Sequence, residues 1–218
     1  RFLPSDSPTL IDVPSAWRDY PNPDQPNAQL PVKGYATYSL KVKLPANTLQ
    51  KDIAFSSPHQ TSAIIWTVWD GAGKTTLGRA QSGTPSTNAK ATTPVILDRA
   101  IVLPELTESD IFIVAHISNF HHSRGGLTKT PQLLSASRAS ANQFKNTTLT
   151  GLTLGICIII GLYHLIIHLQ QRNDEAALLF AALCGSIALR ESSTSNLFEH
   201  LSQNPGLELF NLRMMLEY

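Results

Sequence analysis

The feature that most constrains this chain is an uncharged, strongly apolar stretch in its second half. Residues Leu149–Leu169 contain no Asp, Glu, Lys or Arg. About 20 apolar residues in helical conformation are enough to cross the roughly 30 Å hydrocarbon core of a lipid bilayer. A helix of this length in a soluble protein normally shows a polar face, and this stretch shows almost none. The sequence therefore predicts a transmembrane helix that begins near Leu149.

Composition changes abruptly at this stretch. Residues 1–145 are polar and rich in Pro, Ser and Thr, whereas apolar residues dominate from Leu149 onward. We therefore expect a β-rich domain over residues 1–140 and the start of a multi-helix membrane domain over residues 145–218. The formal net charge of +1 offers no basic stripe for a nucleic acid partner. Because the chain begins with Arg1 rather than Met, we expect a processed or cropped form.

Alternation of apolar and polar residues predicts β-strands in the first part. Residues 1–34 are rich in proline, which lacks a backbone donor and favours extended, loop-like structure. From Tyr35 to Leu44 the apolar residues recur with a period of two, which places them on one face of a strand. Further strand candidates are Ile53–Phe55, Ala63–Trp69, Val95–Leu103 and Asp110–Ser118. Several short strands separated by turn signals are typical of a sandwich or barrel, and we expect a β-sandwich.

A second apolar run follows the predicted span after a polar turn. Ala176–Leu189 is too short to cross a bilayer unaided and would have to extend through Arg190 toward Leu197. Because an Arg at the centre of a membrane helix costs about 2.5–3.5 kcal/mol, Arg190 is either a boundary residue or a buried, paired one. We therefore expect transmembrane helices near residues 147–170, 175–197 and 207–218, the last of them truncated.

Small residues in the apolar runs bear on how the helices pack. Gly151 and Gly155 form a GxxxG pair, which lets a neighbouring helix approach closely. Packing within one chain is favoured here, and a homodimer stays an open alternative. Cys157 and Cys184 both lie in apolar runs, so we expect neither a disulfide framework nor a metal site of the cysteine type.

Histidines form two groups whose spacing could suit a metal ion. His116, His121 and His122 are close in sequence, but neighbouring side chains in an extended chain point apart. We therefore interpret them as solvated residues in a loop at the rim of the sandwich. His164 and His168 share a helix face but lack the Glu of the zinc-protease motif. An interfacial position for this pair is favoured, and we predict no metal site.

Residues Asp70–Thr76 resemble a phosphate-binding loop at first sight. The full pattern requires a glycine at the position that Val68 occupies, and no helical pattern follows. The Asp70-Gly71 dipeptide is instead a strong signal for a hairpin turn. Since the chain shows no nucleophile–base arrangement, no paired-carboxylate motif and no cofactor fingerprint, we predict neither an enzyme nor a cofactor within it.

Two tryptophans and the histidine-rich segment contain the candidates for ligand contact in the first part, although core packing and solvent exposure are the favoured interpretations. Trp66 and Trp69 could stack against a sugar, but their odd spacing places them on opposite faces of one strand. At least one of them is therefore expected in the core. The candidate ligand-binding residues are Trp66, Trp69, Asn119, His121, His122 and Arg124.

Three blocks of the sequence stand out, in this order along the chain: Tyr35–Leu40, Ile117–Leu127, and Gly161–Leu165 followed by Ala188–Arg190. Together they resemble the bacterial seven-transmembrane receptors with diverse intracellular signalling modules. The resemblance implies a periplasmic jelly-roll domain of galactose-binding-like fold, seven helices in the inner membrane, and a cytoplasmic output such as a histidine kinase or nucleotide cyclase. The chain departs from this pattern by stopping near the expected third helix, and no catalytic or ligand motif of the family carries over.

Two functions follow as expectations. The first is a membrane-bound signal-transduction receptor fragment, whose sandwich senses a small ligand, with carbohydrate as the leading candidate, and couples it to the helices. The alternative is a membrane-anchored structural or adhesion module without signalling output. In both cases the lipid bilayer is an expected partner. An enzyme acting on glycans is the least favoured because no carboxylate pair is legible.

Overall fold

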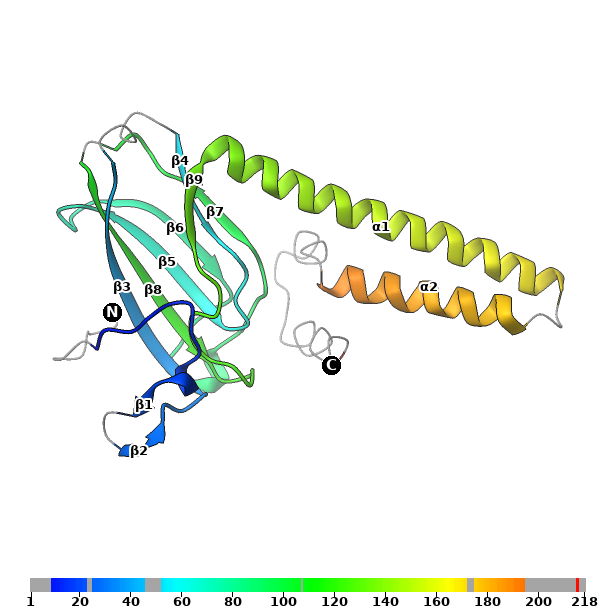
Figure 1. Ribbon diagram of the computed structural model, residues 1–218, viewed down its shortest axis with the longest axis horizontal. Coiled ribbons are helices and arrows are strands. Elements are labelled where there is room, and N and C mark those ends of the chain that lie inside the picture. Colours follow the sequence, from blue (N-terminus) through cyan, green and yellow to red (C-terminus); the bar gives the residue numbers. More distant parts are fainter. Residues whose placement is uncertain are drawn as a thin grey trace. The chain divides into compact units, whose positions relative to one another are not determined.

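The computed structural model describes residues 9–22, 25–45, 52–106, 108–171, 175–194 and 215. It divides into two compact units, Arg1–Ala139 and Ser140–Tyr218, which are described separately below (Figure 1).

The first unit is built almost entirely from antiparallel strands. They are β1 (Pro21–Asn22), β2 (Gln25–Gln29), β3 (Gly34–Lys43), β4 (Ile53–Ser57), β5 (Ala63–Asp70), β6 (Thr76–Ser82), β7 (Arg99–Val102), β8 (Asp110–Asn119) and β9 (Gln132–Ser135). Short 3-10 turns at Trp17–Asp19 (η1) and Ala89–Ala91 (η3) complete the element order. The strands expected at Tyr35–Leu44, Ile53–Phe55, Ala63–Trp69 and Asp110–Ser118 are confirmed as β3, β4, β5 and β8.

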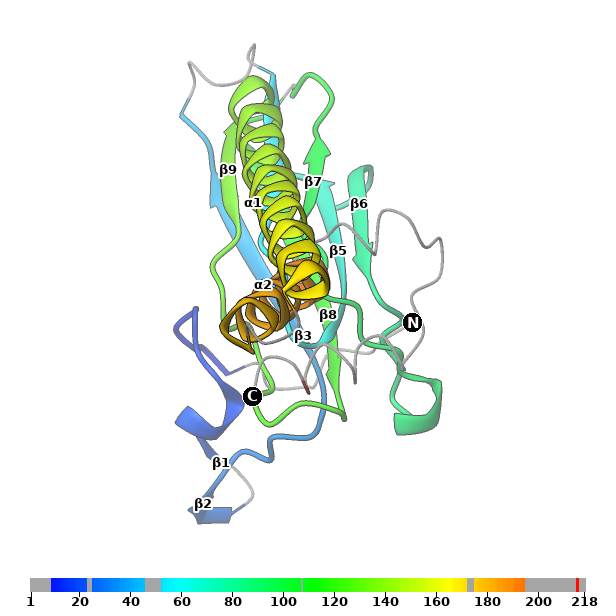
Figure 2. The same ribbon diagram turned by 90° about the vertical axis from the view of Figure 1, so that its right-hand side faces the viewer.

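The strands form two main sheets that share one core. The larger sheet has the order β3-β8-β5-β6, the smaller has the order β7-β4-β9, and β1 and β2 form a separate pair. Figure 1 shows the strands of the larger sheet in one layer and β4, β7 and β9 in another, and Figure 2 shows the same strands after a 90° turn. Phe55 of β4 meets Trp66 of β5 across the core, with ring centroids 5.1 Å apart. The arrangement is sandwich-like, as the period-two patterns predict.

Strand β8 shows most clearly how the sequence fixes the faces of the larger sheet. Ile111, Ile113, Ala115 and Ile117 are buried, whereas the residues between them are partly exposed. Because side chains of a strand alternate between the two faces, one face of the sheet closes the core and the other is directed away from it. The two sheets approach each other closely where β6 meets β7, because a Cβ at Gly78 of β6 would collide with Ile101 of β7.

The structure departs from the strand predictions at five strands, two of which, β1 and β2, lie in the proline-rich segment that was expected to be loop-like. The strand expected over Val95–Leu103 is confined to Arg99–Val102, because Ile96 and Leu97 are buried in an irregular segment. Ser82 donates a hydrogen bond to the carbonyl of Leu97 in that segment. Strands β6 and β9 were not predicted, since β6 is an edge strand rich in polar residues and β9 is very short.

The second unit contains α2 (Glu175–Thr194) and all but the first four residues of α1 (Ala136–Gln170). The prediction that the first helix begins near 147 is wrong, because α1 starts at Ala136, directly after β9. Ser135 explains the early start, since its hydroxyl accepts a hydrogen bond from the backbone N–H of Arg138 and so caps the first turn. The third helix expected at 207–218 lies outside the described residues, apart from Met215.

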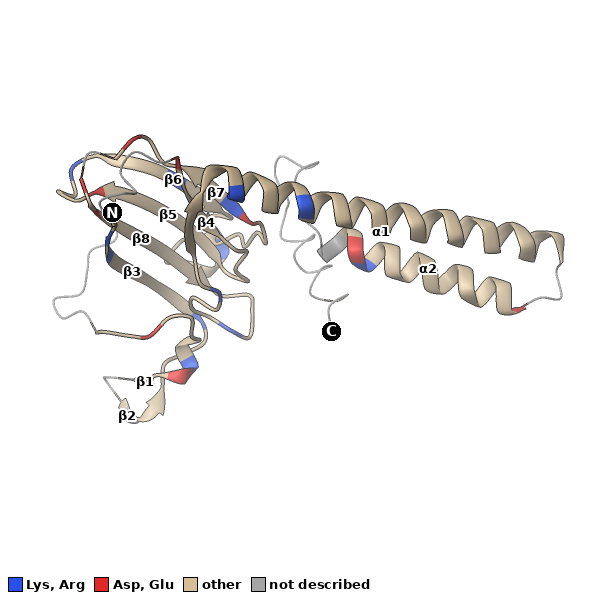
Figure 3. Ribbon diagram, turned by 45° about the horizontal axis from the view of Figure 1, so that its top comes forward, with Lys and Arg blue, Asp and Glu red and all other residues tan. Residues whose placement is uncertain are grey.

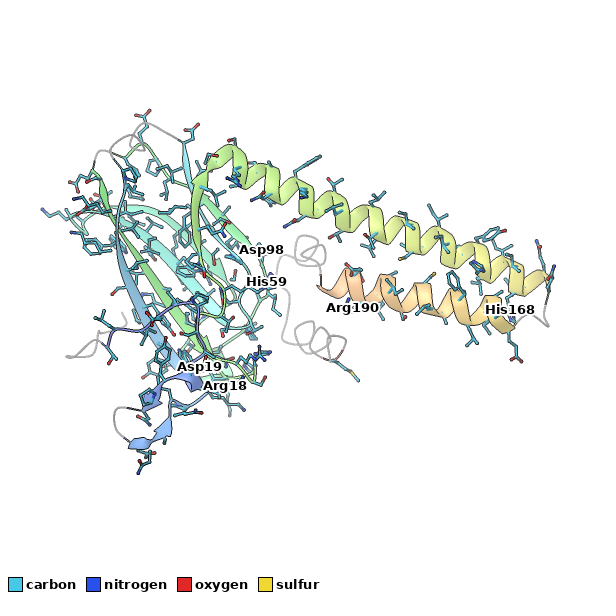
Figure 4. The ribbon with its side chains drawn as sticks, viewed as in Figure 1. Arg18, Asp19, His59, Asp98, His168 and Arg190 are labelled. Atoms are coloured by element: carbon cyan, nitrogen blue, oxygen red, sulfur yellow. The ribbon has the colours of Figure 1, made fainter. Side chains whose placement is uncertain are left out.

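The two helices pack through small side chains. A Cβ placed at Gly161 of α1 would lie 3.2 Å from the Cβ of Cys184 of α2. The ring of His164 packs on that of Phe180 at 4.6 Å between centroids. At Gly151 and Gly155 a Cβ would meet no described atom within 4 Å, so the close contact occurs one segment further along α1 than the GxxxG pair. His168 and Arg190 mark opposite ends of the helix pair (Figure 4).

Among the described helices, α1 is the one long and apolar enough to cross a membrane. Its charged residues, Arg138 and Lys145, both lie in its first turns, and the rest of the helix is free of charge (Figure 3). Its most apolar segment is exposed over most of its length, although Leu154 within it is buried. Large apolar side chains such as Ile159 and Leu169 are therefore exposed, as they would be toward lipid.

Candidate functional site

The side chains of the first unit that are best suited to contact a ligand lie on the solvent-directed face of the four-stranded sheet. We call it the outer face. On the two central strands it is formed by Ile65, Thr67 and Trp69 of β5 and by Phe112, Val114 and His116 of β8. All six are partly exposed, so a strip that is apolar except at Thr67 and His116 runs along the middle of a sheet whose other side closes the core.

Two aromatic side chains lie next to each other at one end of this strip. Trp69 and Phe112 are directly opposite in the register of β5 and β8. Directly opposite residues in an antiparallel pair have Cβ atoms about 4.5–5.5 Å apart. Aromatic faces displayed in this way offer a flat apolar surface to a ring-shaped ligand. This pair is therefore the natural platform of the outer face.

Polar groups flank the apolar strip at the opposite end. The hydroxyl of Thr37 on β3 lies 3.0 Å from Nδ1 of His116 and fixes the orientation of the imidazole. Burial lowers the pKa of His116, and the nearby positive charge of Arg79 lowers it further. His116 is thereby kept neutral around pH 7, with a ring able to exchange hydrogen bonds rather than to bind as a cation.

Lys41 of β3 ties the aromatic end of the strip to a carboxylate. Its Nζ lies 2.7 Å from the carboxylate of Asp110 and 5.6 Å from the centroid of the Phe112 ring. The hydrogen bond from Lys41 lowers the pKa of Asp110, against a smaller effect of desolvation, and the charge of Lys43 acts in the same direction. Asp110 is therefore neutralised by the lysines around it.

Arg79 approaches the strip from the edge strand β6. Its register partner is Thr67 of β5, which also faces outward. The side chain of Arg79 is exposed, and within the described part of the chain no carboxylate lies at ion-pair distance from it. Gln81 follows on the same side of β6 opposite Ile65. The edge strand thus adds one guanidinium and one amide to the outer face.

Trp66 and Trp69 occupy opposite faces of β5, as their spacing predicts. Trp66 is buried against Phe55, and its indole N–H finds no hydrogen-bond partner among the described residues. Trp69 is partly exposed on the outer face. Of the two tryptophans proposed as ligand contacts, the structure thus gives only Trp69 access to solvent.

Residues 119–127 form a latch rather than an open loop. The side-chain amide of Asn119, which is buried, donates to the carbonyls of Val32 and His122 at 2.9 Å each. Its oxygen accepts from the backbone N–H of His122 at 3.2 Å. Nδ1 of the buried His122 accepts from the N–H of Arg124 at 3.0 Å. Asn119 and His122 are therefore occupied in holding backbone.

The same latch holds the N-terminal segment against the sandwich. The backbone N–H groups of Ser15 and Trp17 donate to the carbonyls of Leu127 and Gly125. Gly125 is required here because a Cβ would collide with the Trp17 ring and with the carbonyl of Val32. Of the residues predicted as ligand contacts in this segment, His121 and Arg124 have exposed side chains, and neither reaches the outer face through any contact described.

The segment that resembles a phosphate-binding loop is a hairpin turn between β5 and β6. The carboxylate of Asp70 accepts hydrogen bonds from the backbone N–H groups of Lys74 at 2.7 Å and Thr75 at 3.0 Å. Desolvation raises the pKa of Asp70, but these amide donors outweigh it and hold the pKa below its ordinary value. Gly73 has a positive φ of 67°, which closes the turn.

A second polar cluster links three loops at one end of the sandwich. Nδ1 of His59 lies 2.9 Å from the carboxylate of Asp98, and its Nε2 lies 2.5 Å from Nζ of Lys129. Figure 4 shows His59 and Asp98 side by side. The buried Gln60 beside them accepts from the backbone N–H groups of Thr128 and Lys129. The cluster anchors the segment that leads into β9. Over the residues that the structure describes, no grouping of three His, Cys, Asp or Glu side chains suits a metal ion.

Sequence reasoning missed most of the outer face. Phe112, Arg79 and Thr37 come from three separate strands, and only the register of β3, β8, β5 and β6 brings them together. The alternation within β8 was a usable signal, since it places an aromatic ring and a histidine on the face opposite the buried isoleucines.

No protein-family model matches this chain, and no curated protein matches it.

Proposed function

We propose that this chain is the sensor part of a membrane-bound signal-transduction receptor. The sandwich binds a small carbohydrate on the outer face, and the helices transmit the bound state across a bacterial inner membrane. In this proposal the first unit is periplasmic and has the jelly-roll, galactose-binding-like fold of the receptor family that the sequence resembles. The lipid bilayer surrounds α1 and the helices that follow it.

The observation that carries the proposal is the direct join between sheet and helix. Strand β9 pairs with β4 at the centre of the smaller sheet and ends at Ser135. Helix α1 begins at the next residue, and the N–H of Ala136 donates to the carbonyl of Asp52 at 2.9 Å, just ahead of β4. No flexible linker separates β9 from α1, so a change in the conformation of the sheet would also alter the first turns of α1.

Strand order supports the fold assigned in this proposal. β3 pairs with β8 and β4 pairs with both β7 and β9, so several neighbouring strands are far apart in sequence. Crossovers of this kind are typical of Greek-key sandwiches, among which are the jelly rolls. Such sandwiches frequently present one sheet face to a ligand, and here the outer face carries the aromatic pair Trp69 and Phe112.

The proposal is tested by calorimetric titration of the whole chain in lipid nanodiscs against a panel of neutral and acidic oligosaccharides. We expect at least one sugar to bind, and Trp69→Ala to weaken its binding by about tenfold or more, because a stacked aromatic anchor is lost. Phe144→Ala, which removes an exposed aromatic ring from α1, is the matched control and should bind normally. Failure of every sugar to bind at millimolar concentration would refute carbohydrate sensing.

Signalling and simple anchoring are separated by amide hydrogen exchange of the same sample. A ligand shifts a conformational equilibrium only through different affinity for its two states. A sensor therefore predicts altered exchange in the polar first turns of α1, residues 136–148, when sugar is bound. Unchanged exchange there, with sugar still bound on the outer face, would favour a structural or adhesion module instead.

A further inference from the structure

The charges of the outer face are strongly unequal. Lys41 and Lys43 lie on β3, and Arg79 lies on β6. Among the described strand positions of this face Asp110 is the one carboxylate, and it is held by Lys41 at 2.7 Å. After this pair is neutralised, the face retains Lys43 and Arg79 as positive groups. A ligand with a negative charge would therefore be favoured over a neutral one of the same shape.

Arg79 lies where its guanidinium could bind a ligand group next to the aromatic pair Trp69 and Phe112. It is opposite Thr67, which precedes Trp69 by one outward step along β5. Diagonal neighbours across an antiparallel pair are about 7–8 Å apart, which is within reach of a long side chain. Its guanidinium has no carboxylate partner in the described chain and is exposed. A planar fork of N–H donors suits a carboxylate bidentately.

We infer that the sugar bound on the outer face carries a carboxylate, as uronic acids do, with its ring against Trp69 and its carboxylate on Arg79. This inference rests on the proposed function and narrows its ligand class. The apolar strip accounts for the ring, since one flat face of a pyranose is largely C–H. Thr67 and Gln81, which flank Arg79 on the same face, supply neutral polar partners for ring hydroxyls.

The test compares pairs of sugars that differ only in charge. Trimers of galacturonate, glucuronate and mannuronate, each with its carboxyl-reduced neutral counterpart, are titrated into the whole chain in uncharged nanodiscs. We expect at least one uronate trimer to bind tenfold or more tightly than its neutral partner, and its affinity to fall as salt rises, because salt screens an exposed charge pair.

Variants assign the preference to one residue. Arg79→Gln should reduce uronate binding by tenfold or more while leaving binding of the neutral trimer unchanged. Arg79→Lys should give an intermediate loss, because the charge is kept and the bidentate geometry is not. Lys90→Gln, which removes an exposed cation from η3 outside the sheet, should leave both affinities unchanged.

Each remaining outcome overturns a definite part of the account. Equal binding of charged and neutral trimers, lost in Trp69→Ala, would refute the carboxylate inference and leave the carbohydrate sensor standing. A uronate preference that survives in Arg79→Gln would refute the assignment to Arg79. Uronate binding that is undiminished in Trp69→Ala would refute the placement of the sugar ring against Trp69. Binding of no sugar at all would refute the proposed function together with this inference.

Discussion

Single residues of the first unit show how a cluster of polar side chains can be structural. Asn119 and His122 lie in a segment rich in histidine, glycine and arginine, which in sequence resembles a ligand loop. In the structure their polar atoms bind backbone carbonyls and amides. Buried polar groups need such partners because an unsatisfied one costs free energy. The residues that can face a ligand are instead distributed singly over several strands.

Asn119→Ala is expected to destabilise the first unit by about 2–3 kcal/mol, since it removes three hydrogen bonds and leaves buried backbone groups unpaired. Arg124→Ala, at an exposed side chain of the same segment, should change stability by less than about 0.5 kcal/mol. Denaturant unfolding of the whole chain in detergent, followed by tryptophan fluorescence, measures both. Equal effects of the two variants would contradict the latch.

Acid should weaken the pairing of Lys41 with Asp110. The pKa of Asp110 is lowered in the folded chain, so the stability it contributes is present above its unfolded pKa of about 3.9 and is lost as pH falls through the lower folded value. We expect Asp110→Asn to melt at a lower temperature than wild type near pH 7. When the pH is lowered to about 3, the melting temperature of the variant should fall by less than that of wild type. Glu105→Gln, at an exposed carboxylate outside the sheets, is the control. Parallel melting curves for wild type and Asp110→Asn at all pH values would contradict this prediction.

How far residue roles can be predicted depends on whether the signal is local. Spacing along β5 is enough to separate Trp66 from Trp69, but it cannot say which of them is buried. That choice is made by the smaller sheet, whose Phe55 covers Trp66. Nothing in the sequence pointed to Arg79, because the residues of β6 resemble a polar loop. The face of the sheet on which Arg79 lies is set only by the pairing of β6 with β5.

At the scale of elements, α1 departs most from expectation. Hydropathy predicts the apolar part near 149–169 well, but the helix starts at Ala136, which is 11 residues before residue 147. Residues 136–150 contain neither Gly nor Pro, and helix-forming Ala, Arg, Gln and Lys residues among them continue the helix outward without a break. A hydropathy pattern reports where a helix meets lipid, and says little about where it begins.

Packing of α1 on α2 should depend on Gly161 and not on Gly155. A side chain at Gly161 would press on Cys184, whereas Gly155 has open space among the described residues. Gly161→Leu should therefore lower the melting temperature of the helix pair in detergent by several degrees. Gly155→Leu gains the same helix propensity and should not lower it. Circular dichroism at 222 nm follows both melts, and an equal drop in the two variants would contradict the packing described here.

At the scale of the whole molecule, the division into a β-rich part and an apolar helical part could be predicted from the sequence. Composition suffices for this because strands with one buried face and helices that meet lipid have very different residue patterns. Strand order and register could not be predicted, since they depend on contacts between residues far apart in the chain. The outer face, a product of that register, was accordingly out of reach.

Anchoring by α1 is the claim on which the sensor account depends, and alkaline carbonate extraction of membranes from cells expressing the whole chain tests it most directly. Peripheral proteins are released by this treatment, whereas a protein held by a helix that crosses the hydrocarbon core is retained until detergent dissolves the bilayer. The account predicts that the chain stays in the membrane pellet and enters solution only with detergent. Recovery of the folded chain in the carbonate supernatant would contradict it.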